Sequence, residues 1–227
     1  MSLAEKILDF MGAVHYEGQL PDGIHIMNPY RESEDIRSIC SAFYHKFYAD
    51  TQPRKIILGI NPGRLGAGAT GLPFTDTVRL TKICEIDYTQ FSTYEPSSVF
   101  IYDMIEAFGG VDKFYSMFYI NSVCPLGFVS LNGTKTINYN YYDSKKLQVL
   151  LEDFIVSNIK MQKSLVQRSD VCFCLGAGKN YTYLSRLNDV YGFFDKVVPL
   201  EHPRYIMQYK HKQKAEYIQD YLQKLME

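Results

Sequence analysis

The sequence predicts an α/β fold in which helices cover both faces of a central, mainly parallel four-stranded sheet. Short apolar runs typical of buried strands occur four times, at residues 54–60, just before Val123, at 170–176 and at 195–203. Helical spacing separates each run from the next, as in three-layer α/β/α domains. The chain has 227 residues, 46% of them hydrophobic, which suits one domain, residues 1–227, with a substantial core.

The elements follow in chain order. Residues 1–50 are expected to form a helical extension packed on the domain, with one amphipathic helix over 3–14 and a second over 33–50, which begins with the capping residue Ser33. Further helices are expected at residues 75–86, 97–110, 144–168, 178–192 and 205–226. Between them, residues 131–143 form a polar, aromatic excursion with a turn at Asn132–Gly133.

The charge balance restricts how the chain could bind nucleic acid. The formal net charge is -1, whereas a nonspecific nucleic-acid binder is usually basic, so contact with DNA must be local. Residues 202–214 form one basic segment, which contains Arg204, Lys210, Lys212 and Lys214 and no acidic residue. The alternative interpretation of this segment is the solvated face of a C-terminal helix.

Cysteine usage and the N-terminus favour a reduced, cytoplasmic protein without metal. The five cysteines are odd in number and scattered, and Cys172 and Cys174 alternate within a strand-like run, as core thiols do. Neither a Cys-x-x-Cys pair nor a His-Cys cluster occurs. The first apolar stretch is too short and too acidic for a signal peptide, and none of the apolar runs approaches the length of a membrane span.

Polar and aromatic side chains follow the predicted strands. In parallel sheets, ligands bind beyond the carboxyl ends of the strands. Asn61 follows the first strand, Asn121 lies at the end of the second and His202 follows the fourth. These three residues are therefore expected to converge on one cleft, with Phe74 on the loop that returns from the first strand.

The glycine-rich loop at residues 59–74 invites a phosphate-binding interpretation, but it lacks the Lys-Ser/Thr pair of a P-loop and the spacing of a dinucleotide fingerprint. A single Asn after a strand usually forms a turn, and a single His before Pro is usually structural. The ordered set Asn-Pro-Gly, Thr-Gly-x-Pro-Phe, Asn-x-x-Cys-Pro-Leu and His-Pro, each at a strand end, is far more specific.

The stretches GINPG…ATGLPF, INSVCPL and EHPRY resemble the uracil-DNA glycosylase superfamily, and within it the single-strand-selective monofunctional branch, over roughly residues 54–215. GINPG is also similar to the mismatch-specific uracil/thymine glycosylases, but His202 favours the first branch. The spacing Asn-x-x-Cys is one residue longer than in that branch, so either Asn121 or Ser122 could read the base. We prefer Asn121, because an amide offers both a donor and an acceptor. Arg204 stands where the branch has Ser.

The resemblance implies a monofunctional glycosylase that flips uracil, a 5-modified uracil or another deaminated base out of DNA for base excision repair and leaves an abasic site. Phe74 would stack on the base, His202 would stabilise the departing anion and Asn61 would position water. Gly63, in place of a bulky aromatic, would leave room at the 5-position. The motif contains no Lys that could form a Schiff base.

The expected site residues follow from the same resemblance. The catalytic pair is Asn61 and His202. The base-binding residues are expected to be Gly59, Ile60, Pro62, Gly63, Gly71, Phe74 and Asn121. The DNA-contacting residues are expected to be Arg204, Tyr205, Met207, Lys210 and Lys212. We expect a monomer that uses no cofactor or metal and binds single- or double-stranded DNA. The alternatives are a mismatch-specific uracil/thymine glycosylase, a catalytically silent nucleic-acid-binding domain of the same fold and a small-molecule nucleotide-binding protein.

Overall fold

The computed structural model describes residues 1–168 and 170–226. Its central sheet confirms the predicted fold class: four strands lie in the order β3-β2-β6-β7, and each neighbouring pair is parallel. The strands are β2 (Lys55–Gly59), β3 (Phe118–Ser122), β6 (Val171–Leu175) and β7 (Lys196–Leu200). β3 is buried along its whole length, which explains the apolar run at residues 118–120 ahead of its polar end.

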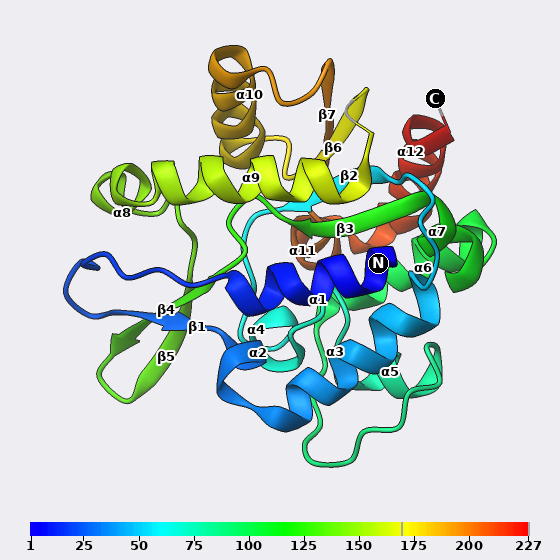
Figure 1. Cartoon of the computed structure of the whole chain (residues 1–227), viewed down its shortest axis with the longest axis horizontal. Coiled ribbons are helices and arrows are strands. Elements are labelled where there is room, and N and C mark those ends of the chain that lie inside the picture. Colours follow the sequence, from blue (N-terminus) through cyan, green and yellow to red (C-terminus); the bar gives the residue numbers. More distant parts are fainter. Residues whose placement is uncertain (169, 227) are drawn as a thin grey trace.

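Helices cover the sheet on both sides (Figure 1). α9 packs on β2, α10 packs on β6 and β7, and α6 packs against α11 and α12. The helices are α1 (Leu3–Ala13), α2 (Pro29–Glu32), α3 (Glu34–Phe47), α4 (Ala67–Thr70), α5 (Thr77–Lys82), α6 (Pro96–Phe108), α7 (Val111–Met117), α8 (Lys145–Leu150), α9 (Glu152–Val166), α10 (Lys179–Tyr191), α11 (Pro203–Tyr209) and α12 (Lys214–Met226). Ser2, Ser33 and Asp76 cap α1, α3 and α5 through their side chains.

A second, three-stranded sheet was not predicted. β1 (Ile24–Met27) pairs antiparallel with β4 (Gly127–Asn132), which pairs with β5 (Lys135–Tyr139). The N-terminal extension is therefore not wholly helical, and the polar excursion is a β-hairpin that turns at Gly133, where φ is 59°. The turn was visible in the sequence. Its strands were not, because β5 is short, largely exposed and mostly polar.

Two predicted helices are each divided. The helix expected over 144–168 bends between α8 and α9, and the bend buries Leu147 and Leu151. The C-terminal helix is divided at Lys210, and a short 3-10 turn (His211–Gln213) joins α11 to α12. α11 begins at Pro203, directly after His202, because proline is well tolerated at the first position of a helix.

Candidate nucleotide-binding cleft

A cleft of about 290 Å³ lies beyond the carboxyl ends of β2, β3 and β7. This is where the topology of a parallel sheet places a ligand site, and the volume suits a small ligand. Its lining includes Asn61, Phe74 and His202, so the structure brings together three of the four residues that the sequence predicted to converge. Ile60, Pro62 and Gly63 line it as well.

The Asn61 side chain is held in one orientation by the last residue of β5 and the segment that follows it. Its Oδ1 accepts a hydrogen bond from the Tyr141 backbone N–H at 3.2 Å, and its Nδ2 donates to the Tyr139 carbonyl at 3.2 Å. A backbone donor on one side and a backbone acceptor on the other define which end of the amide is oxygen. Asn61 therefore presents a fixed carbonyl oxygen with one lone pair still unused. Sequence reasoning missed this clamp, since it treated residues 131–143 as an excursion.

Phe74 rests directly on the end of β2. A Cβ atom added to Gly59 would lie 2.9 Å from the Phe74 ring, so only glycine allows the ring to pack on this strand. Phe74 adopts a left-handed backbone conformation, with φ at 53°, which is uncommon for an aromatic residue. Its ring centroid lies 6.2 Å from that of His202. Gly59 thus acts by seating Phe74 and does not itself line the cleft.

His202 is neutral and oriented. It is the N-cap of α11, and its Nδ1 accepts a hydrogen bond from the Arg204 backbone N–H at 3.1 Å. In a neutral imidazole with Nδ1 as acceptor, the proton is on Nε2. Burial, followed by the charge of Arg204, lowers the pKa of His202 to about 4. Near neutral pH the residue is therefore an uncharged hydrogen-bond donor.

The structure places Asn121, the preferred base reader, outside the cleft lining. Asn121 Nδ2 donates to the Tyr119 hydroxyl at 2.6 Å, and its Oδ1 accepts from the Ser122 backbone N–H at 2.8 Å. Both ends of the amide are thus bonded within the chain, and Asn121 does not line the cleft. Ser122 lines it instead. Successive residues of a strand point to opposite sides, so only one of the two can face the ligand.

Glu95 lines the cleft and was not among the predicted residues. It precedes α6, and Ser98 Oγ donates a hydrogen bond to its Oε2 at 3.0 Å. Burial raises the pKa of Glu95 to about 7; the negative charge of Asp76 adds to this rise, whereas the Ser98 hydrogen bond and Arg204 oppose it. Sequence reasoning missed Glu95 because it lies in a loop that is distant, along the chain, from the end of every predicted strand.

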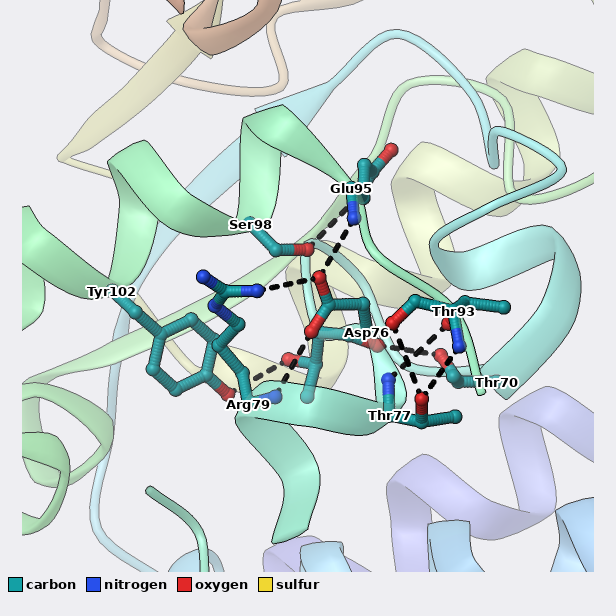
Figure 2. Close-up of polar contacts among 9 residues, drawn as sticks. Thr70, Asp76, Thr77, Arg79, Thr93, Glu95, Ser98 and Tyr102 are labelled. Carbon is teal, nitrogen blue, oxygen red and sulfur yellow. Dashed lines mark hydrogen bonds and ion pairs between the residues drawn. The ribbon is translucent and has the colours of Figure 1, made fainter. Parts of the chain in front are cut away.

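A buried polar cluster beneath the cleft fixes the position of Glu95 (Figure 2). Asp76 is fully buried and accepts hydrogen bonds from the backbone N–H of Arg79 at 2.9 Å and of Glu95 at 2.7 Å. Its carboxylate also pairs with the Arg79 guanidinium at 3.0 Å. As Figure 2 shows, the Glu95 backbone faces Asp76, and Ser98 lies beside the Glu95 carboxyl.

The other predicted residues divide between the cleft and the core. Arg204 and Tyr205 line the cleft, and both are exposed on α11. Met207 is half-buried and packs against the core, as the alternative helix-face interpretation requires. Lys210 and Lys212 lie outside the cleft lining. Gly71 is also absent from that lining: its φ is 71°, and an added Cβ would lie 2.8 Å from the Cys40 sulfur.

Within residues 1–168 and 170–226, no group of three or more His, Cys, Asp or Glu side chains is placed to hold a metal ion. In the same described residues, no helix has both the length and the apolar character needed to cross a membrane.

Comparisons with known proteins agree with the motifs. The family model of the uracil DNA glycosylase superfamily matches residues 45–226. A crystal structure of wild-type SMUG2 from Pedobacter heparinus superposes with a TM-score of 0.97 at 52% sequence identity, covering 100% of this chain and 97% of that one. A search of curated proteins found no match.

Proposed function

The chain belongs to the uracil DNA glycosylase superfamily, and on that premise we propose that it is a monofunctional DNA glycosylase. It flips uracil, or a related deaminated or 5-modified base, out of DNA and hydrolyses the N-glycosidic bond to leave an abasic site for base excision repair. The observation that carries this proposal is the joining, in one cleft, of an aromatic face, a clamped amide oxygen and a neutral imidazole.

Each of the three groups has a distinct task. The Phe74 ring stacks on the flipped base, an interaction worth about 1–3 kcal/mol. The Nε2–H of His202 donates to O2 of the base and stabilises the negative charge that grows as the bond breaks. Asn61 accepts a hydrogen bond from the attacking water through the free lone pair of its Oδ1. An amide cannot take up a proton near neutral pH, so Asn61 contributes by orientation.

Ser122, in the place where the sequence favoured an amide, supports a broad choice of base. A serine hydroxyl rotates and serves either as donor or as acceptor. It can therefore pair with the N3–H of uracil or with its O4, and equally with the edge of a deaminated purine. A fixed amide would instead select one donor–acceptor pattern. We propose that uracil is one of several deaminated bases that this cleft accepts.

The exposed start of α11 is the proposed DNA contact. Arg204, Tyr205 and Tyr209 line the cleft mouth and are exposed, so they can reach the phosphates and bases that flank the flipped nucleotide. We also propose that the protein is a monomer. We propose a reducing, cytoplasmic location for it, which the five free and buried cysteines support.

The test is incubation with single- and double-stranded oligonucleotides that carry uracil, 5-hydroxymethyluracil, hypoxanthine, xanthine or a thymine mismatch, followed by alkaline cleavage at abasic sites. The proposal expects strand breaks only after alkali, and their loss in Asn61→Ala and His202→Ala. Preference for mismatched thymine would favour the mismatch-specific alternative. DNA binding without cleavage of any base would favour the silent binding domain.

A further inference from the structure

The glycine-rich loop makes room for the Glu95 carboxyl. A Cβ atom added to Gly66 would collide with that carboxyl, and one added to Gly63 would lie 3.5 Å from Glu95 Oε1. The same position on Gly63 lies 3.4 Å from Nδ2 of Asn138, a β5 residue. The space that these glycines leave open is therefore bordered by a carboxyl oxygen and an amide nitrogen, both of which form hydrogen bonds.

The Glu95 carboxyl and the Asn138 amide are each held by one hydrogen bond within the protein, and each keeps one polar atom for a ligand. Glu95 Oε2 is occupied by Ser98, whereas Oε1 has no hydrogen-bond partner among the residues that the structure describes. Asn138 Oδ1 accepts from the Arg64 backbone N–H at 3.0 Å, and this bond fixes the amide with its Nδ2 on the side of Gly63. Glu95 and Asn138 both line the cleft. One acceptor and one donor are thus directed at the same space.

The position of this space relative to His202 indicates which part of a base would enter it. His202 follows β7, whereas Gly63 follows β2, and β6 lies between these two strands. On a uracil ring, C5 lies directly across from C2, which bears O2. A base whose O2 faces His202 therefore directs C5 toward the wall on the β2 side, where Gly63, Glu95 and Asn138 lie.

We propose that Glu95 and Asn138 form a polar subsite that hydrogen-bonds a substituent at C5 of the flipped base, which makes Glu95 a specificity-determining residue. This inference rests on the proposed function, because it takes O2 of the base to face His202. A hydroxymethyl group satisfies both Oε1 and Nδ2. The methyl group of thymine satisfies neither and leaves both polar groups desolvated and unpaired, which strongly disfavours that base.

The protonation of Glu95 makes the subsite sensitive to pH. The charged groups around it are Asp76, which is paired with Arg79, and Arg204 at the cleft mouth; His202 across the cleft is neutral. With a pKa of about 7, the Glu95 carboxyl changes between donor and acceptor near neutral pH. A 5-formyl oxygen can only accept, so it binds the protonated carboxyl and is repelled by the carboxylate. A 5-hydroxymethyl group binds either form.

The test measures single-turnover excision of uracil, 5-hydroxymethyluracil, 5-formyluracil and thymine from one oligonucleotide sequence at pH 6 and pH 8. For the unmodified protein, the ratio of 5-formyluracil to uracil excision should fall about tenfold between these pH values. In Glu95→Gln, which has the same shape but does not titrate, that ratio should be equal at both. In Glu95→Leu, the preference for 5-hydroxymethyluracil over thymine should fall about tenfold.

The matched control is Glu106→Gln, which removes a carboxylate from the exposed face of α6, the helix that Glu95 precedes. It should reproduce every excision ratio of the unmodified protein. A pH trend that persists in Glu95→Gln would come from ionisation of the base and would overturn the inference. If Glu95→Leu does not fold, Glu95→Gln alone decides it. Failure of the unmodified protein to excise uracil contradicts the proposed function itself, whereas normal uracil excision with unchanged ratios in the Glu95 variants contradicts the subsite alone.

Discussion

Replacing Glu95 by Gln should stabilise the protein, and more so at pH 8 than at pH 5. Burial raises the pKa of this carboxyl from an ordinary value of 4.5 to about 7. Between these two values the folded protein holds a proton that the unfolded chain has already released, so the free energy of unfolding falls as the pH rises. Above pH 7 both states are ionised, and the cost of the buried charge is present in full.

The magnitude follows from the size of the shift. One pKa unit corresponds to about 1.4 kcal/mol, so the full shift sets an upper limit of about 3 kcal/mol. Glu95 is only half-buried at the cleft wall, and solvent screens part of this cost. We therefore expect the stabilisation by Glu95→Gln, measured as the free energy of unfolding relative to the unmodified protein, to increase by about 1–2 kcal/mol between pH 5 and pH 8. The Gln carbonyl can still accept the Ser98 hydrogen bond, so packing is retained.

Thermal unfolding at a series of pH values measures this effect, because 1 kcal/mol shifts the Tm of a domain of this size by about 2–4 °C. The control is Glu106→Gln, which removes one charge from an exposed position on α6. The difference in Tm between Glu95→Gln and the unmodified protein should widen from pH 5 to pH 8. A difference that stays constant across this range, or that matches the control, would refute the raised pKa of the Glu95 carboxyl.

Three further predictions concern the cleft and its rim. Asn121→Ala should lower the free energy of unfolding by about 1–3 kcal/mol, because it leaves buried partners unbonded, whereas Ser122→Ala should change the excision rate and leave the Tm nearly constant; the reverse pattern would restore Asn121 as the base reader. His202→Ala should slow single-turnover excision by about 100-fold. Since the pKa of His202 lies at about 4, this factor should be the same at pH 5.5 and pH 7.5, and a factor that grows at low pH would indicate a cationic imidazole. Reversing the charges of Lys210 and Lys212 together should weaken DNA binding and flatten its salt dependence, as measured by fluorescence anisotropy at several salt concentrations, without lowering the Tm; unchanged binding would place the DNA elsewhere.

Most of the central fold could be read from the sequence because parallel strands are buried on both faces and appear as short continuous apolar runs. The same rule located the cleft, since residues just after such strands meet at one edge of the sheet. Asn61, Phe74 and His202 were found in this way. The β1-β4-β5 sheet escaped prediction because β1 and β5 are short and not buried and lack the continuous apolar run of a core strand, although the hairpin turn at Gly133 was recognised.

The sequence by itself determined the motif order and the type of each catalytic candidate, whereas tertiary structure decided which neighbours face the ligand. Asn121 and Ser122 are adjacent in β3, a strand buried on both sides, so no apolar alternation reveals which of them faces the cleft. Only the packing of β3 against β2 assigns the cleft to Ser122. Glu95 lies more than 30 residues beyond Asn61, and no local spacing joins them. The buried Asp76 holds Glu95 in place by accepting a hydrogen bond from its backbone, and long-range hydrogen bonds of this kind leave no periodic signal in a sequence.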